Sequence, residues 1–122
     1  MLLAIAMTLA PINYDRLIES LAAVESGNNY EIRGGGLQWT ERTWKEEAPH
    51  MVYTLAMHKP TSTILAKNRL HRFAAHFIRD GIEPTAYALA LSWRFGYEGA
   101  KAKLTLLEAN DYATRVNNLY EL

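Results

Sequence analysis

Apolar residues recur at helical spacing along most of the chain, whereas the strict alternation that marks a half-buried strand does not occur. The first stripe should begin near Asn13, which follows Pro11 and can cap a helix, and should end at Gly27. Asp15 then falls in the first turn, where a negative charge complements the helix dipole. The pattern predicts a mainly all-α fold with little or no β structure.

The rest of the chain divides into further helices and one long loop. Residues 28–39 carry three consecutive glycines, which favour a loop with room for a short extended pair. Helices are expected from Thr40 to Pro49, over the less clearly patterned stretch 51–59, over 62–80, after Pro84, over about 98–109 and from Asp111 to the chain end. The stretch TAYALALSWRFG after Pro84 is apolar on nearly every side, which predicts a central helix surrounded by the others.

The opening segment, MLLAIAMTLAP, is apolar and admits two interpretations. It is similar to the hydrophobic part of a secretory signal, but it lacks the basic residues that precede such a part, and it is too short to span a bilayer. The other interpretation, which we favour, is an ordered segment packed on the core. We therefore divide the chain into an N-terminal segment over residues 1–13 and one domain over residues 14–122.

Composition and charge limit the class of protein. A chain of 122 residues with 49% hydrophobic residues fits one ordinary globular domain. Lys plus Arg balance Asp plus Glu at 13 each, so the whole chain has no electrostatic footprint for nucleic acid or an anionic membrane. The absence of cysteine excludes disulfides, thiolate metal sites and thiol nucleophiles. A neutral or mixed partner is the better expectation.

One carboxylate, Glu25, stands at the end of the first apolar stripe. It is four residues from Leu21 and seven from Ile18, a spacing that aims its side chain inward. Burial disfavours the ionised form of a carboxyl, and so does the negative end of the helix dipole, so the position suits a proton-donating acid. The alternative is that Glu25 turns aside at a frayed helix end and is solvated.

Other candidate chemistry is weak. The histidines at positions 50, 58, 71 and 76 show no metal-ligand spacing, and RGGGLQW does not fit a phosphate-binding loop, so no metal and no cofactor is expected. The basic residues of the helix over 62–80 are most simply a solvated face, with a glycan-wall or nucleic-acid surface as the less favoured alternative. They are Lys67, Arg69, Arg72 and Arg79.

Three blocks of the sequence, in order, resemble the lysozyme-like superfamily of peptidoglycan-cleaving enzymes, in particular soluble lytic transglycosylases and goose-type lysozymes. LIESLAAVESGNN followed by GGLQWTERTW looks like the helix that ends in the catalytic Glu-Ser pair and the Gly-x-x-Gln segment after it. YALALSWRFG is similar to the central helix, although Trp93 and Arg94 stand where the family has Tyr and Asn. DYATRVNNLY looks like the terminal helix, in which a Tyr faces the active site.

The resemblance implies an enzyme that cleaves the glycan strand of peptidoglycan in the periplasm or outside the cell, or a phage-encoded enzyme made in the cytoplasm. Glu25 would be the general acid and base. Residues that would orient it or line the sugar groove are Ser26, Gln38 and Tyr112, with Arg94 nearby on the central helix. Tyr30, Trp39 and Trp93 offer aromatic faces on which sugar rings can pack, and for Trp93 the alternative is a core aromatic residue. The Tyr112 hydroxyl would hydrogen-bond Glu25, unless it is an ordinary core tyrosine. An Arg94 guanidinium near Glu25 would oppose the acid role. A monomer is the default expectation.

The number of carboxylates separates possible mechanisms. Most glycosidases need two, whereas the resemblance to lytic transglycosylases implies that one suffices, because the muramic C6 hydroxyl closes a 1,6-anhydro ring. The phage-lysozyme pattern wants an acid nine residues after the Glu and a Thr six further on, where this chain has Gly34 and Thr40. Glu31 and Glu41 are remote candidates for a second acid. The alternative functions are a catalytically degenerate glycan- or partner-binding domain and, disfavoured by neutral charge, a DNA-binding module.

Overall fold

The computed structural model describes residues 11–122, and within this range it is all-α, as the sequence pattern predicts. The chain forms helices α2 (Tyr14–Ser26), α3 (Glu41–Glu47), α4 (Lys59–Arg79), α5 (Ala86–Leu106) and α6 (Asp111–Tyr120), with a 3₁₀ helix, η1 (Tyr53–Met57), before α4. No β-strand occurs among these residues. The expectation for residues 1–10 of the N-terminal segment lies outside the described part of the chain.

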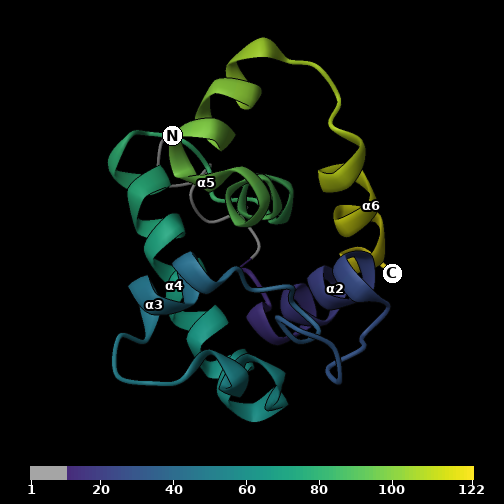
Figure 1. The fold of residues 1–122 in the computed structure, drawn as a ribbon. Coiled ribbons are helices and arrows are strands. Elements are labelled where there is room, and N and C mark those ends of the chain that lie inside the picture. The colour runs from purple at the N-terminus through teal and green to yellow at the C-terminus, as the bar shows by residue number, and fades with distance from the viewer. Residues whose placement is uncertain (1–10) are drawn as a thin grey trace.

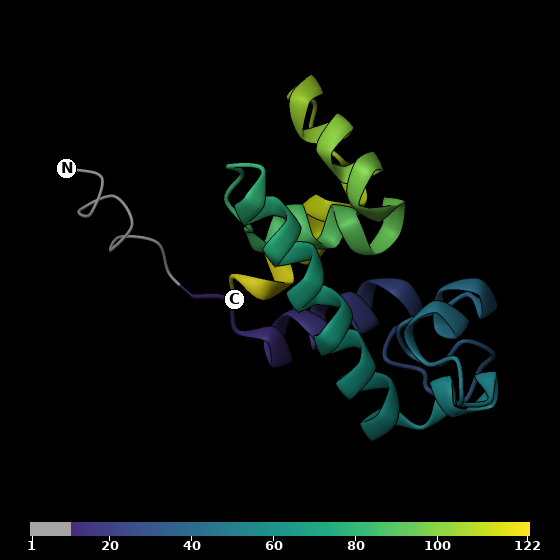
Figure 2. The same cartoon turned by 90° about the vertical axis from the view of Figure 1, so that its left-hand side faces the viewer.

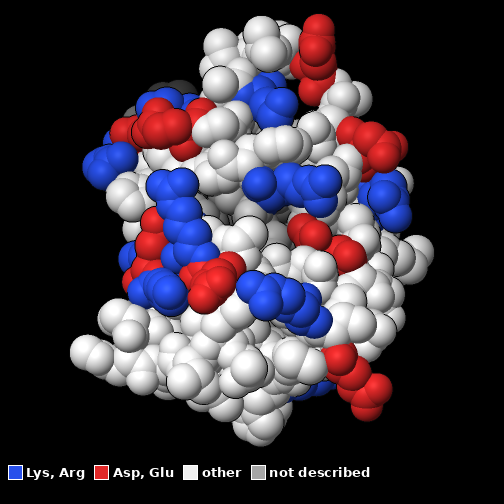
Figure 3. All heavy atoms as spheres, in the orientation of Figure 1, with Lys and Arg blue, Asp and Glu red and all other residues white. Residues whose placement is uncertain are grey.

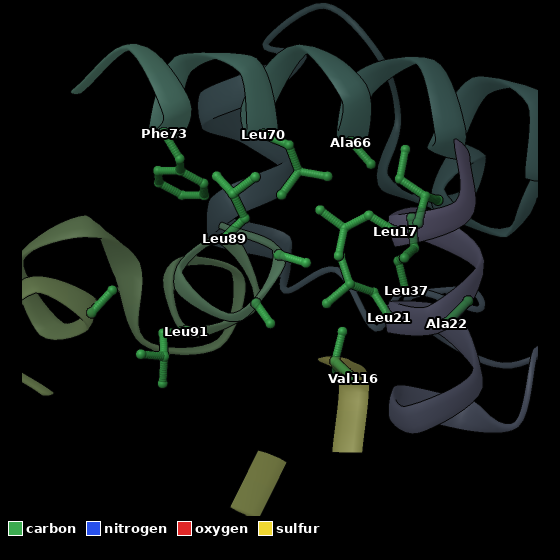
Figure 4. Close-up of a cluster of buried hydrophobic side chains, with 14 of the residues drawn as sticks. Leu17, Leu21, Ala22, Leu37, Ala66, Leu70, Phe73, Leu89, Leu91 and Val116 are labelled. Carbon is green, nitrogen blue, oxygen red and sulfur yellow. The ribbon is translucent and has the colours of Figure 1, made fainter. Parts of the chain in front are cut away.

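The first half of α5 lies in the middle of the molecule (Figure 1). Helices α4 and α6 pack on α5, and α2 packs on both α4 and α6. Consecutive residues of α5, from Ala88 to Ser92, are almost fully buried, which confirms the central helix. Figure 4 shows side chains of α2, α4, α5 and α6 meeting in the core, together with Leu37 from the loop after α2.

Capping residues fix where several helices begin. The side chain of Asn13 accepts a hydrogen bond from Arg16 N at 3.1 Å, and α2 ends at Gly27 in the left-handed conformation. Thr40 caps α3 in the same way through Thr43 N, and Thr85 caps α5 through Ala88 N. These contacts confirm the starts predicted for α2 and α3, and α5 begins at Ala86, after Pro84 as expected.

The structure corrects one expected element, the loop after α2, and bears out the helix expected after Gly96. Residues 28–39 form consecutive turns instead of an extended pair, held by backbone hydrogen bonds such as Trp39 N to Gly34 O at 3.0 Å. The helix expected over 98–109 is present as the second half of α5, which follows a break in the helical backbone at Gly96 and ends at Leu106. This half projects away from the rest of the molecule (Figure 2).

The kink in α5 depends on Gly96. Its φ of 76° and ψ of 169° fall in a region that essentially only glycine adopts. A Cβ added at Gly96 would meet nothing within 4 Å, so the constraint is on the backbone and not on space. The helical backbone is therefore interrupted at Gly96, and α5 changes direction directly after Trp93 and Arg94.

We expect Gly96→Ala to lower the free energy of unfolding by about 1–3 kcal/mol, because alanine must pay the strain of this backbone conformation. Urea denaturation followed by circular dichroism measures the change. Glu98→Ala, two residues further along an exposed part of α5, is the control and should stay within about 0.5 kcal/mol of the parent. A Gly96→Ala variant as stable as the control would show that alanine adopts this backbone conformation without strain.

Candidate active site

A cleft of about 280 Å³ lies where the end of α2, the start of α3, α4 and the middle of α5 come together. In the view of Figure 3, basic and acidic side chains lie close together around the middle of the face where Figure 1 shows α5. The volume is near the lower end for ligand pockets. The lining residues are Glu25, Gln38, Trp39, Thr40, Thr43, Arg69, Trp93, Arg94 and Gly96.

Glu25 enters the cleft from the last turn of α2. Its side chain is only 11% exposed, so it does not turn aside into solvent. The Tyr112 hydroxyl, from α6, donates a hydrogen bond of 2.7 Å to Oε2, which is the contact expected from the sequence. Arg94 Nη1, from α5, lies 3.7 Å from Oε1. Three helices thus hold this one carboxyl.

The electrostatics around Glu25 work in opposite directions. Burial disfavours its negative charge, whereas the hydrogen bond from Tyr112 and the Arg94 guanidinium stabilise that charge. Burial raises the pKa of the Tyr112 hydroxyl above its ordinary value, and the hydrogen bond to Glu25 raises it further. Tyr112 therefore remains a neutral donor at physiological pH. Arg94 also lies over the Tyr112 ring, with Cζ 4.9 Å from the ring centroid.

The loop after α2 forms one wall of the cleft through Gln38. This residue has a φ of 54°, and its Nε2 donates to Gly35 O at 2.8 Å and to Arg33 O at 3.1 Å. Ser26, which the resemblance also names, is hydrogen-bonded to the loop. Its Oγ donates to Gly36 O at 2.7 Å and accepts from Asn29 N. Ser26 thus positions the loop, and it is not part of the cleft lining.

Three tryptophans form a packed cluster beside the carboxyl. Trp39 packs edge-to-face against both neighbours, with 4.9 Å between its ring centroid and that of Trp93 and 5.2 Å to that of Trp44. Trp39 is 3% exposed and donates from Nε1 to Ser62 Oγ at 3.0 Å. Trp93 is half-buried and lines the cleft, so it is the aromatic residue with more surface to offer a ligand. Trp39 contributes mainly core packing.

Tyr30 is not brought into this cleft. Its ring packs against Gly36, where an added Cβ would lie 2.3 Å from a ring carbon, and Lys59 Nζ lies over the ring at 5.6 Å. Tyr30 lines a different hollow, beside Ile18 and Lys59. The close approach explains why the loop needs glycine at position 36. Tyr30 and Glu25 line different hollows.

The structure adds Arg69 to the site, although the sequence suggested a solvated position for it. Its side chain is 16% exposed and lies against Glu47, with Nη1 3.5 Å from Oε2. Glu47 is itself only 2% exposed and also pairs with Arg72. A buried carboxylate thus anchors the guanidinium at the wall of the cleft.

No other carboxylate lines the cleft among residues 11–122. Glu31 is exposed, and Glu41 pairs with Arg33 and Lys45 on the surface. A larger hollow of about 580 Å³ lies beside the start of α2 and the chain end, and Glu25 is not part of it. Within the described range no three His, Asp or Glu side chains gather as a metal site would require, and no helix is both long and apolar enough to cross a membrane.

Comparison with protein-family models, with curated proteins and with solved structures finds no match to this chain. The described part of the chain is an all-α domain whose cleft holds one carboxyl, Glu25, that is largely buried and is oriented by a hydrogen bond from Tyr112.

Proposed function

We propose that this chain is a lysozyme-like domain that cleaves the glycan strand of peptidoglycan, with Glu25 as general acid and base. The observation that carries the proposal is the setting of this carboxyl: it is 11% exposed, accepts a hydrogen bond from Tyr112 and lines a cleft beside Trp93. A shielded and oriented carboxyl is what proton transfer to a glycosidic oxygen requires. The three sequence blocks that resemble the family support the same reading. This substrate would place the site of action at the cell wall.

The chemistry that fits one carboxylate is an intramolecular displacement. Protonated Glu25 donates its proton to the glycosidic oxygen as the bond from the anomeric carbon to that oxygen breaks. The Glu25 carboxylate then takes the proton of the muramic C6 hydroxyl while O6 bonds to the anomeric carbon. The proton is returned, and no water is consumed. This scheme is favoured because no second carboxylate lines the cleft in the described part of the chain, as a hydrolytic enzyme of the usual kind would need.

Product analysis tests this mechanism. Incubation of the protein with purified cell walls should lower their turbidity and release fragments with 1,6-anhydro ends, detected by mass spectrometry as products 18 Da lighter than those with reducing ends, about the mass of one water. Mutanolysin-type digestion of the same walls provides the reference with reducing ends. Reducing ends from this protein would contradict the one-carboxylate mechanism and leave glycan cleavage standing.

A second candidate function is glycan binding without cleavage, and one contact favours it. The Arg94 guanidinium, 3.7 Å from Glu25, stabilises the ionised carboxylate, which cannot start the reaction as an acid. Sedimentation of the protein with insoluble walls distinguishes the two functions. Binding with no release of fragments at any pH from 4 to 8 would support the binding domain and overturn cleavage.

A further inference from the structure

Two guanidinium groups line the cleft that holds Glu25. Arg94 comes from α5 and Arg69 from α4, so they are contributed by different helices. Glu25 is the single carboxylate among the described lining residues, so two guanidinium groups and one carboxylate face the cleft, while Glu46 and Glu47 pair with Arg69 outside the lining. The whole chain, in contrast, has a formal net charge of 0. The excess of basic over acidic side chains is thus a property of the cleft lining and not of the whole chain.

Arg69 is held in a way that leaves part of its guanidinium for a ligand. Its contacts with acids in the described chain, to Glu47 at 3.5 Å and to Glu46 at 3.7 Å, both use Nη1. Arg72 makes the closer contact with the same buried Glu47 and does not line the cleft. The Arg69 guanidinium also stacks over Phe73, with Cζ 5.1 Å from the ring centroid. A guanidinium has five N–H donors in a rigid plane, so Nε and Nη2 can face the cleft.

These observations narrow the chemistry of the ligand. A neutral sugar does not need a cation, whereas guanidinium groups bind carboxylates with strong charge-assisted hydrogen bonds. We propose that Arg69, together with Arg94, forms an anion subsite that binds a carboxylate of the glycan beside the bond to be cleaved. This inference rests on the proposed function, because it assigns the ligand of the same cleft. The carboxylate can come from the lactyl group of peptide-free muramic acid or from an attached peptide.

Binding experiments with chemically matched glycans test the subsite. The probes are peptide-free glycan strands, the same strands with their carboxyl groups reduced to alcohols, and strands that keep their peptides. All proteins carry Glu25→Gln so that the probes stay intact, and sedimentation gives the dissociation constants. The parent should bind the peptide-free strands about tenfold or more tightly than the reduced strands, with a preference that weakens in 0.5 M NaCl. Equal affinities for all three probes would overturn the proposal without any further variant.

The variant Arg69→Gln should lose this preference by weakening the binding of carboxylate-bearing strands about tenfold or more, with the reduced strands bound as before. Arg72→Gln is the matched control, because it removes a partner of the same Glu47 and leaves the cleft lining unchanged. If Arg69→Gln and Arg72→Gln lose the same affinity, Arg69 has a structural role alone and the subsite is overturned. The same conclusion follows if Arg69→Gln binds carboxylate-bearing and reduced strands with the same loss of affinity.

The arms of the experiment also separate the two proposals and the two sources of the carboxylate. If only the peptide-free strands bind tightly, the ligand is the lactyl carboxylate. If the peptide-bearing strands bind tightly, the ligand is a carboxylate of the peptide. Carboxylate-dependent binding by a protein that never cleaves walls would sustain the subsite and overturn catalysis. Absence of binding to all three probes would overturn both.

Discussion

Glu25→Gln should abolish the loss of turbidity of purified cell walls, with a rate at least about 10²–10⁴-fold below that of the parent. An amide cannot donate a proton to the glycosidic oxygen, and no other carboxylate lines the cleft among the described residues to replace it. The fold should be retained, since the amide oxygen can accept the hydrogen bond that Tyr112 now donates to the carboxyl. Release of soluble fragments from the walls measures the rate.

The matched control is Glu31→Gln, which makes the same chemical change six residues along, at an exposed position outside the cleft. It should cleave walls at the parental rate. A Glu25→Gln variant that matches this control would remove Glu25 from the mechanism. Circular dichroism spectra of both variants, compared with the parent, exclude loss of fold as the reason for any difference.

The helices were predictable because their signals are local. Asn13 and Thr40 form the N-cap hydrogen bonds that their residue types favour, and Gly27 takes the left-handed conformation that ends α2. The inward position of Glu25 follows from its spacing to Leu21, which is fully buried. Such features need only the period of the helix and the chemistry of one residue.

The features that sequence reasoning missed depend on contacts between distant segments. The course of the loop over residues 28–39 is set by close packing: a Cβ at Gly35 would lie 2.0 Å from Ala56 O, and the Tyr53 hydroxyl donates to Trp39 O. The direction that α5 takes after Gly96 likewise depends on the helices that it packs against, α4 and α6. Neither outcome follows from local propensity.

Arg69 carried a signal that could have been used. It stands three residues after Ala66 and four before Phe73, on the edge of the buried stripe of α4. An arginine at such a position requires an acidic partner if it is shielded from water. Glu47, whose side chain is 2% exposed, is that partner, but the pairing of α3 with α4 was not visible in the chain.

The charges of Arg69 and Arg94 also bear on the proposed function of the cleft. Arg94 places a positive charge 3.7 Å from Glu25, and in the proposed anion subsite a bound carboxylate would partly neutralise that charge. Ligand binding would then weaken the attraction between Arg94 and the Glu25 carboxylate, so the two guanidinium groups are compatible with the proposed cleavage. A neutral glycan would lack this effect.

Trp44→Ala should have the largest effect on stability, lowering the free energy of unfolding by about 3–5 kcal/mol. Trp44 is fully buried in α3, and its Nε1 donates to Val52 O at 3.1 Å and to Met51 O at 3.2 Å. Truncation leaves a cavity, deprives both carbonyl groups of their donor and removes the ring on which Trp39 packs.

The free energy of unfolding of such a domain is typically about 5–15 kcal/mol, so this loss should move the urea midpoint far below that of the parent. Loss of the ring contact should also loosen Trp39, which lines the cleft. Circular dichroism follows the unfolding without depending on tryptophan fluorescence. Trp44→Phe keeps an aromatic ring but loses the N–H donor, and we expect an intermediate loss of about 1–3 kcal/mol. Val52→Ala, at a side chain that is 66% exposed, is the control and should change stability by less than about 0.5 kcal/mol. If Trp44→Ala were as stable as Val52→Ala, the indole could not be the buried link between α3 and η1.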